Sequence, residues 1–365
     1  MKNIICFVSS MDAGGAETFL MKIYRTIDKD NYRFDFIVNS KHRGFYDNEI
    51  EKLGGHIFYS PPKSKHPFLN LICSYKIIKC GNYDAAMRMT SHSLGTIDLL
   101  VAKIAGVKKL ILRSTNAGNT GNRFSLILHH MFSFLPRRIP NIKIAPSKLA
   151  AEYLFGKGCV KSDVVEILHN GIPIQPFTFS ERRRAEKRKI LGLTDNFVIG
   201  NIGRFNIQKN HKYLISVFSE VYKLNKNARL LLIGTGELEN QIRKQVNSLG
   251  LSQVVLFLGV RKDVQDLLMA MDVFVFPSLF EGMPNVIVEA QATGLPCIIS
   301  STITREVKMT EQVEFISIFD EDILKWSSII LNNCTNCIDR LKGIEQIKRH
   351  GYDINYVCSN FVNLI

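Results

Sequence analysis

The chain has 365 residues, of which 46% are hydrophobic, and this length usually forms two domains rather than one. Its net charge of +14 favours anionic partners: nucleic acid, an acidic membrane surface or phosphorylated ligands. No apolar run approaches the ~20 residues needed to cross a bilayer, and the opening MKNIICFVSS is too short and too strand-like for a signal peptide. We therefore expect a cytoplasmic protein that is peripheral on the inner face of the cytoplasmic membrane, in contact with its anionic surface.

The basic excess lies mainly in the first half. Residues 1–180 contain 24 Lys and Arg against 13 Asp and Glu, and the totals of 47 and 33 leave 23 against 20 for the rest. The lysines do not alternate with aromatic residues in a nucleic-acid-binding pattern, so nucleic acid is not an expected partner. The eight cysteines are scattered, as in reduced proteins, and Cys334 and Cys337 lack the second pair or histidines of a zinc site. We predict no metal or redox centre there.

Short apolar runs alternate with helical patterns along the chain. Strands are predicted first at 4–8, 34–38, 85–88, 110–112, 142–145 and 164–168, with helices at 17–27, 68–80, 93–105, 123–134 and 147–155. After a turn at 169–173 and a charged segment at 180–189, strands are predicted at 197–202, 230–233, 254–257, 273–276 and 296–299, with helices at 210–224, 237–248, 263–270 and 285–293. Such alternation is typical of parallel sheets covered by helices on both faces.

The pattern predicts an α/β protein with two Rossmann-like parallel-sheet domains. We expect an N-terminal domain at 1–175 and a C-terminal domain at 176–344, joined near 170–180. The tail at 345–365 has no strand partner, and as a helix it can pack back on the N-terminal domain.

Ligands of open parallel sheets bind at the carboxyl ends of the strands, and several segments fall there. Gly14 and Gly15 precede a helix and let the backbone approach an anion, although the pair also suits a plain turn. Gly203 opens a loop in which Arg204 and Lys209 can converge on a diphosphate and stabilise it as it leaves. A solvated basic loop is the alternative.

A third segment, GTGE at 234–237, matches the dinucleotide fingerprint only in its first half, because Glu239 stands where the third glycine belongs. A nicotinamide or flavin site is therefore not favoured. The fourth segment, FPSLFEGMPNVIVEAQATGLP at 276–296, places Glu281 before a proline turn and Glu289 on the helix that follows. The two carboxylates can address different parts of one elongated ligand, or they are solvated surface residues.

The first domain offers candidates for a second substrate. His92 follows the strand at 85–88, and Arg113 and Asn116 follow the strand at 110–112. A lone histidine is more often a structural hydrogen-bonding residue. Residues 123–143 combine an apolar face with four cations, which suits either an amphipathic helix on an anionic leaflet or a core helix.

The sequence resembles the retaining glycosyltransferases of family 4, whose two Rossmann-like domains face each other across a cleft in the GT-B arrangement. The segments that carry the resemblance span nearly the whole chain: GGAE (14–17), NGI (170–172), GRxxxxKN (203–210), IGTGE (233–237) and EGMPNVxxEAQATGLP (281–296). Within that family it is most similar to bacterial capsule and exopolysaccharide enzymes, through QKNH (208–211), APSKLAAEYLFG (145–156) and IISSTITREV (298–307).

The resemblance implies roles for these residues. Arg204 and Lys209 would bind the donor diphosphate, backed by Gly15, while Glu281 would bind the transferred sugar and Glu289 the ribose. The other implied donor contacts are Gly14, Gly203, Gly234, Val260, Arg261, Gly282, Met283, Pro284 and Asn285, with the base near Val260 and Arg261. The residues expected to act in catalysis are Arg204, Lys209, Glu281 and His92; His92, Arg113 and Asn116 form the acceptor side.

The resemblance further implies retention of anomeric configuration without a metal or cofactor. The expected donor is a UDP-sugar carrying a hexose or N-acetylhexosamine, and the expected acceptor is a polyprenyl-diphosphate-linked glycan in capsule, exopolysaccharide or O-antigen synthesis. Relatives often have histidine where Arg113 stands and aspartate where Ser301 stands, so acceptor recognition is the least defined part. A UDP-sugar epimerase of the same architecture and a non-catalytic scaffold that binds nucleotide sugar remain alternatives.

Overall fold

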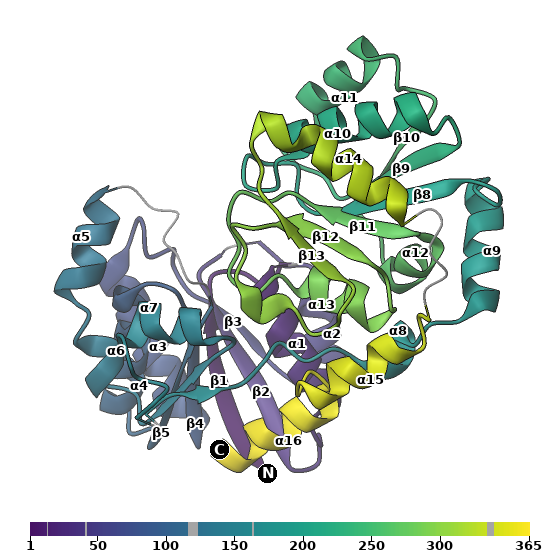
Figure 1. The fold of residues 1–365 in the computed structure, drawn as a ribbon. Helices are drawn as coiled ribbons and strands as arrows, with labels where there is room; N and C mark the ends of the chain where they lie inside the picture. Colours follow the sequence, from purple (N-terminus) through teal and green to yellow (C-terminus); the bar gives the residue numbers. More distant parts are fainter. Residues whose placement is uncertain (13, 41, 116–122, 163, 334–338) are drawn as a thin grey trace. The chain divides into compact units, whose positions relative to one another are not determined.

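The computed structural model describes residues 1–12, 14–40, 42–115, 123–162, 164–333 and 339–365. The chain forms two units, and Figure 1 shows that each combines strands and helices. Unit 1 comprises Met1–Ile172 and Gly351–Ile365, and unit 2 comprises Pro173–His350. Each unit contains a parallel sheet, which confirms the predicted α/β fold class with two Rossmann-like domains. The predicted Asn116, Cys334 and Cys337 lie outside the described residues.

The described part of unit 1 is built on a seven-stranded sheet of order β3-β2-β1-β4-β5-β6-β7. The strands are β1 (Lys2–Val8), β2 (Tyr32–Val38), β3 (Ile57–Tyr59), β4 (Ala85–Thr90), β5 (Lys109–Ser114), β6 (Ile142–Ala145) and β7 (Glu166–Ile167). The helices are α1 (Gly15–Thr26), α2 (Asp47–Lys52), α3 (Pro67–Gly81), η1 (Ser93–Thr96), α4 (Ile97–Ile104), α5 (Arg123–Met131), α6 (Leu135–Arg138), α7 (Lys148–Phe155) and α16 (Ile354–Leu364).

Both faces of this sheet are buried, which explains why β1 reads as a continuous apolar run. Ile4 and Cys6 belong to the hydrophobic core on the face of α1 and α16, and Ile5 and Phe7 belong to the core on the face of α3 and α4. The C-terminal helix α16 packs against α1, so the end of the chain completes the core of unit 1.

The described part of unit 2 is built on a six-stranded sheet of order β10-β9-β8-β11-β12-β13. The strands are β8 (Phe197–Ile202), β9 (Ala228–Ile233), β10 (Val255–Gly259), β11 (Val273–Phe276), β12 (Cys297–Ser300) and β13 (Val313–Ile316). The helices are α8 (Ile174–Phe177), α9 (Glu181–Leu191), α10 (His211–Leu224), α11 (Glu239–Ser248), α12 (Val264–Ala270), α13 (Asn285–Ala292), η2 (Arg305–Val307), η3 (Asp320–Asp322), α14 (Ile323–Asn332) and α15 (Lys342–Arg349). No helix in the described ranges has the length and apolar character needed to span a bilayer.

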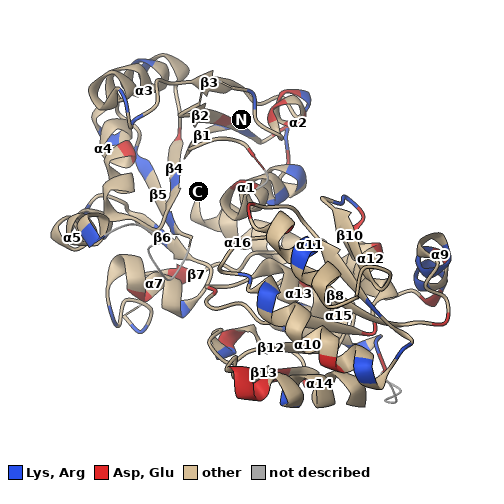
Figure 2. Cartoon of the chain, turned by 90° about the horizontal axis from the view of Figure 1, so that it is seen from above, with Lys and Arg blue, Asp and Glu red and all other residues tan. Residues whose placement is uncertain are grey.

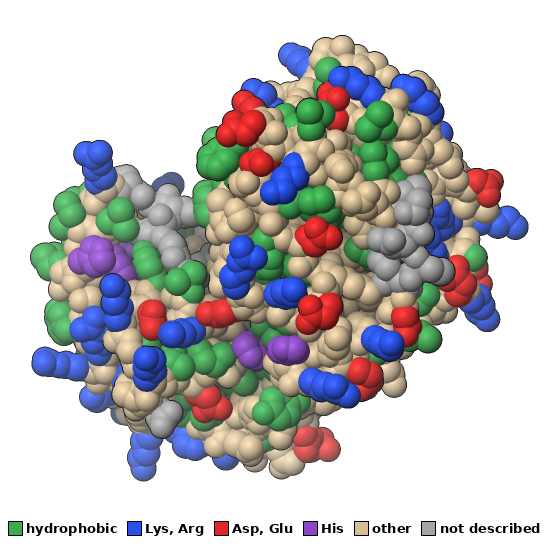
Figure 3. Space-filling view, viewed as in Figure 1, with side chains coloured by type: hydrophobic (Ala, Val, Ile, Leu, Met, Phe, Trp, Pro, Cys, Tyr) green, Lys and Arg blue, Asp and Glu red, His purple; other side chains and the backbone are tan. Residues whose placement is uncertain are grey.

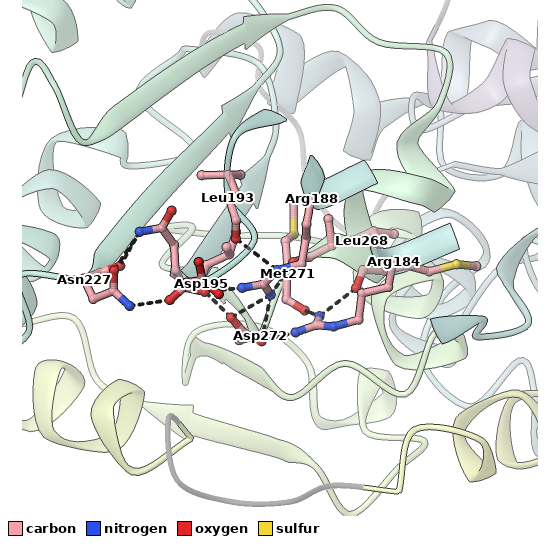
Figure 4. A network of polar contacts seen from close by, with 12 residues as sticks. Arg184, Arg188, Leu193, Asp195, Asn227, Leu268, Met271 and Asp272 are labelled. Carbon is pink, nitrogen blue, oxygen red and sulfur yellow. Dashed lines mark hydrogen bonds and ion pairs between the residues drawn. The ribbon is translucent and has the colours of Figure 1, made fainter. Parts of the chain in front are cut away.

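The charged segment at 180–189 forms helix α9, which the sequence pattern did not predict. Arg188 is its only buried residue among those described, so the helix has no apolar stripe to detect. Its arginines instead bind the C-terminal end of α12: Arg184 donates to the carbonyls of Met269 and Met271, both at 2.8 Å, and pairs with Asp272 at 2.5 Å. Figure 2 shows the charges along α9, and Figure 4 shows the network close by.

Some of the other unpredicted elements are short or lie at sheet edges, whereas the ten-residue helix α14 was missed although it buries Trp326 and Ile330. β3 has three residues at one edge, and β13 contains exposed Glu314 at the edge of the second sheet, so neither shows a long apolar run. The predicted helix at 93–105 begins as the 3-10 turn η1 and becomes regular only at Ile97. The strands that the sequence pattern predicts are therefore those buried on both faces, because their residues are apolar without a break.

Candidate active site

Three loops meet at the carboxyl edge of the unit 2 sheet, after the neighbouring strands β9, β8 and β11. The backbone N–H of Gly203 donates to the carbonyl of Ile233 at 2.9 Å, so the loop after β8 is fixed to the end of β9. Asn201, buried within β8, donates its side-chain N–H to the carbonyl of Val275 in β11 at 2.7 Å. The sequence does place a polar residue inside this apolar strand, but the contact between Asn201 and Val275 was not predicted from it.

Glycine is required where these loops touch backbone to backbone. Gly234 has a φ of +130°, and a Cβ added there would lie 2.2 Å from the carbonyl oxygen of Gly203. A Cβ on Gly236 would lie 2.4 Å from the carbonyl oxygen of Phe205. The two glycines of the segment GTGE at 234–237 are therefore explained by close packing between the loops that follow β8 and β9.

Lys209 and Glu281 connect the loops that follow β8 and β11. Lys209 Nζ lies 2.6 Å from Glu281 Oε1 and 4.6 Å from the centre of the Phe276 ring. The two side chains are 17% and 9% exposed, so the ion pair is mostly desolvated but reachable. Gln208 strengthens the connection, since its carbonyl accepts from Leu279 N–H at 2.8 Å and its amide donates to Phe280 at 2.9 Å.

Arg204 is placed differently from the predicted convergence with Lys209. Its Nε lies 3.2 Å from Glu237 Oε2, and its side chain is 72% exposed. The Arg204–Glu237 pair thus joins the second and third predicted segments at the solvent boundary. Exposed ion pairs contribute only about 0–1 kcal/mol, so little free energy holds Arg204 in this position.

The proline turn leads into α13 as predicted. Pro284 is the N-cap residue of α13, in an extended conformation with φ of −73° and ψ of 114°. Glu289 lies half-buried on this eight-residue helix, and Met283 before it is buried. Gly282 and Asn285, the remaining predicted contacts of this segment, are partly exposed on either side of the turn.

The segment predicted to receive the base lies after β10. Val260 is exposed, while Arg261 is engaged by Asp263 through two contacts of 2.8 and 2.7 Å. Lys187 also contacts Asp263 at 2.7 Å, and these partners, Arg261 first, lower the pKa of that carboxyl group. Arg261 is therefore positioned by a carboxylate that stays ionised.

A cavity of about 400 Å³ lies behind the loop that carries Lys209. His211, the first residue of α10, lines this cavity and stacks on Phe205 with ring centres 4.3 Å apart. Neither ring nitrogen has a hydrogen-bond partner, although only 2% of the residue is exposed. Burial, with a smaller contribution from Lys209, lowers the pKa of His211 to about 4, so the ring is neutral at neutral pH.

In unit 1, the first glycine segment begins α1, with Gly14 as N-cap. A Cβ on Gly14 would lie 2.3 Å from Glu17 Oε2, so the chain's own carboxylate folds over this first turn. Burial raises the pKa of Glu17. Space around Gly15 is open. An anion could approach this helix end only beside or in place of the Glu17 carboxylate.

His92 uses both ring nitrogens on the backbone of unit 1. Nδ1 accepts from Leu94 N–H at 3.2 Å, and Nε2 lies 2.9 Å from the carbonyl oxygen of Ser125. These contacts assign the proton to Nε2 and make His92 the N-cap of η1. A catalytic His92 would have to break one of them.

Arg113 is buried, with 2% of the residue exposed. Its Nη2 donates to the carbonyl of Leu168 at 3.1 Å and to Asn170 Oδ1 at 2.6 Å, and its guanidinium lies 3.7 Å from the centre of the Phe19 ring. Burial lowers the pKa of Arg113 to about 9. The structure thus gives Arg113 contacts within the unit 1 core rather than at its surface.

Comparison with known proteins places the chain among glycosyltransferases. The family described as "Glycosyl transferases group 1" matches residues 196–324, which include Lys209, Glu281 and Glu289. The putative glycosyltransferase EpsF of Bacillus subtilis is 34% identical over 314 residues, covering 84% of this chain and 81% of the relative. The Escherichia coli UDP-Gal:alpha-D-GlcNAc-diphosphoundecaprenol alpha-1,3-galactosyltransferase is 30% identical over 238 residues, covering 64% of this chain and 61% of the relative.

Among solved structures, Anabaena Alr3699/HepE in complex with UDP and glucose has a TM-score of 0.81 at 19% identity. The alignment covers 100% of this chain and 99% of that one. The predicted two-domain glycosyltransferase fold is thereby confirmed. The chain belongs to the group 1 glycosyltransferases, and it is a glycosyltransferase with two parallel-sheet domains.

Proposed function

We propose that the chain is a retaining, metal-independent glycosyltransferase that moves a sugar from a UDP-sugar to a lipid-linked glycan in capsule, exopolysaccharide or O-antigen synthesis. The observation that carries the proposal is the Lys209–Glu281 ion pair, which spans two loops at the carboxyl edge of the unit 2 sheet. Ligands of such sheets bind at this edge. A desolvated cation and carboxylate side by side suit a ligand with an anionic part and a hydroxyl-rich part.

Lys209 would bind the donor diphosphate. An ammonium has three N–H donors, and only one is needed for Glu281, so phosphate oxygens can share this cation. Arg204 would turn from Glu237 to the same diphosphate, because a weak exposed pair can be exchanged for a bidentate contact with phosphate. Charge that develops on the leaving diphosphate would then be stabilised without a divalent cation.

Glu281 would accept hydrogen bonds from hydroxyls of the transferred sugar. Lys209 orients this carboxylate through their 2.6 Å contact, so it would act as a positioning residue for Glu281 as well as a donor ligand. Glu289, one turn into α13, would accept from the ribose, and Gly234 would allow the loops to close around the nucleotide.

In the reaction we propose, the bond between the anomeric carbon and the diphosphate oxygen breaks, and the bond to the acceptor hydroxyl oxygen forms on the same face. The acceptor proton passes to the departing phosphate oxygen, and the UDP leaves with the bonding electron pair. Retention of configuration is supported by the family resemblance. His92 has no assigned proton transfer in this scheme, because its nitrogens contact Leu94 and Ser125.

The nature of the substrates is supported by similarity. The E. coli relative is named for a UDP-sugar donor and a diphosphoundecaprenol-linked acceptor, and the Anabaena structure contains UDP and glucose. The particular sugar and linkage depend on contacts around Glu281 that these names do not specify for this chain.

A panel of nucleotide sugars tests the proposal, with the full chain, a polyprenyl-diphosphate-linked glycan and EDTA present. A new glycosidic bond with the donor's anomeric configuration is the expected product. Conversion of the donor to its epimer without acceptor would instead identify an epimerase. Binding of nucleotide sugar with neither product would identify a scaffold.

A further inference from the structure

The cavity behind the loop that carries Lys209 is separate from the proposed donor contacts. It lies between the start of α10 and the first half of α11, two helices that pack against each other, and its volume is about 400 Å³. The loop after β8 and Leu279 after β11 complete its walls. The described residues that line it include none of the donor ligands proposed above. Cavities of this size hold small molecules.

His211 is the strongest indication that this cavity binds a ligand. Only 2% of the residue is exposed, yet neither ring nitrogen has a hydrogen-bond partner among the described residues. Because burial lowers the pKa of His211 to about 4, the ring is neutral at neutral pH and has one N–H donor and one acceptor nitrogen. Buried polar groups are normally paired, so a ligand in the cavity would supply the missing partners.

Side-chain amides accompany this histidine. Asn210 and Gln241 line the same cavity, and their side-chain amides make no hydrogen bond within the part of the chain that the structure describes. Gln245 also lines it and is held in place, since its amide donates to the carbonyl of Lys212 at 3.1 Å. Each amide has both N–H donors and a carbonyl acceptor. The cavity therefore offers donors and acceptors side by side.

The rest of the lining is mainly apolar. Leu238, the N-cap residue of α11, lies opposite the polar groups in the chain's order of elements, and Ile242 of α11 and Leu279 add further apolar surface. A ligand that fits this lining has hydrogen-bonding groups together with C–H surface.

Charge does not select the ligand. Lys212 is the one charged side chain among the described lining residues, and it is exposed. On the face of unit 2 that Figure 3 shows, basic and acidic side chains are interspersed, so this surface favours neither sign. Among the described residues, no group of three or more His, Cys, Asp or Glu could hold a metal ion. A wholly apolar ligand would leave the imidazole and the amides unpaired.

We propose that the cavity binds one sugar residue of a glycan through its hydroxyl groups. A hydroxyl both donates and accepts, so it can satisfy a neutral imidazole and side-chain amides, while the C–H groups of the sugar ring pack on Leu238, Ile242 and Leu279. Glycans are the class of molecule on which a glycosyltransferase acts. The inference goes beyond the proposed function, because the sugar held in this cavity is not the sugar that is transferred.

The cavity is connected to the proposed donor site through the backbone around Lys209. Asn206 and Asn210, which both line the cavity, lie on either side of this lysine. The backbone N–H of Lys209 donates to Asn206 Oδ1 at 3.1 Å, and Asn210 has a φ of +53°, which few residues other than glycine adopt. A sugar bound to these residues would fix the loop from which Lys209 contacts Glu281, so UDP should bind more tightly. This coupling, unlike the sugar site itself, rests on the proposed function.

Saturation-transfer NMR with the full chain tests the sugar site. The probes are the methyl glycosides of glucose, galactose, mannose and N-acetylglucosamine, and adenosine is included as a nucleoside that also carries hydroxyls. UDP is present at saturation, so that the proposed donor site is occupied. We expect saturation transfer to at least one glycoside and none to adenosine.

Two variants remove polar groups from the cavity. His211→Phe keeps a ring stacked on Phe205 but lacks both nitrogens, and it should weaken binding of the glycoside about tenfold. Gln241→Ala removes an exposed amide without disturbing the core, and it should weaken binding about threefold or more. The matched control is Asn240→Ala, a neighbouring exposed amide outside the lining, which should bind the glycoside like the unchanged protein. Glu281→Ala, which alters the proposed donor site, should do the same.

Three results would overturn the proposal. They are the absence of transfer to every glycoside, transfer to adenosine in place of the glycosides, and loss of glycoside binding in Glu281→Ala but not in His211→Phe and Gln241→Ala. The last would place the bound sugar in the donor site.

The coupling is measured by calorimetry as the affinity for UDP with and without the glycoside that gives the strongest transfer. Binding of UDP about fivefold tighter is expected, and an unchanged affinity would overturn the coupling. Absence of UDP binding together with glycoside binding that His211→Phe weakens would count against the proposed function alone.

Discussion

The carboxyl edges of the two sheets use their charged residues in different ways. In unit 2, Lys209 pairs with Glu281 across two loops and stays 17% exposed. In unit 1, Arg113 is buried against backbone and Asn170, and both ring nitrogens of His92 contact backbone. Charged residues near the carboxyl ends of parallel strands thus form an accessible ion pair in unit 2, whereas in unit 1 Arg113, inside β5, and His92, after β4, make internal contacts. Position near the end of a strand therefore does not by itself define the contacts that a charged residue makes.

The largest expected effect is on the unit 2 pair. Lys209→Ala removes the proposed diphosphate ligand and leaves Glu281 buried without its cation, so transfer should fall about 100- to 1000-fold. Initial rates with a saturating acceptor measure this loss. Lys223→Ala, an exposed lysine on α10, is the control and should keep the unchanged rate. Equal transfer rates for Lys209→Ala and Lys223→Ala would contradict the assignment of the donor site to unit 2.

A pair of glycine variants tests how tightly the unit 2 loops interlock. Gly234→Ala meets the carbonyl of Gly203 at 2.2 Å in addition to its positive φ, whereas Gly250→Ala has a positive φ of 69° and open space. We expect a loss in unfolding free energy of about 3 kcal/mol for the first and about 1 kcal/mol for the second. Urea unfolding measures both, and only Gly234→Ala should weaken UDP-sugar binding. Similar losses would show that the contact with Gly203 is not restrictive.

The pH dependence of stability tests whether His211 in unit 2 is buried in its neutral form. Because the folded pKa of His211 is lowered to about 4 from 6.5, the unfolded chain binds more protons between these values. The stabilisation is present above pH 6.5 and is lost as pH falls towards 4, by about 3 kcal/mol. His211→Phe keeps the stacking on Phe205 and should remove this part of the acid sensitivity in urea unfolding at several pH values. Parallel pH profiles for both proteins would contradict the assignment.

The smallest effect is expected in unit 1. His92→Ala removes the cap of η1 and the contact with Ser125, so unfolding free energy should fall by about 1 kcal/mol while transfer changes less than about threefold. Thermal unfolding and initial rates separate the two effects. A loss of transfer by more than about 100-fold with unchanged stability would make His92 a catalytic residue and end the contrast between the edges.

Much of the fold could be predicted from the sequence because burial leaves a pattern. Strands such as Phe197–Ile202 and Val273–Phe276 are apolar on both faces, and their predicted bounds match the structure. Helix α9 could not be found in this way, since ion pairs with Asp263, Asp266 and Asp272 hold it in place of an apolar stripe. Long-range polar contacts of this kind leave no periodicity.

The candidate site was predictable to a similar degree. Lys209 and Glu281 could be predicted as site residues because each follows a predicted strand. Their 2.6 Å contact could not be predicted, because it joins residues 72 positions apart in the sequence. Arg113 has the charge expected of a ligand, and the sequence alone could not predict that its guanidinium is buried and donates to Asn170. The predicted roles of the site residues stay predictions until the variants are measured.

The most direct test is the affinity of the full chain for a UDP-sugar in EDTA, measured by calorimetry for the unchanged protein, Lys209→Ala and His92→Ala. Loss of a charge-assisted contact should weaken binding about tenfold or more in Lys209→Ala, and His92→Ala should bind like the unchanged protein. Binding that required a divalent cation, or that was weakened by His92→Ala and not by Lys209→Ala, would contradict a metal-independent donor site centred on Lys209 and Glu281.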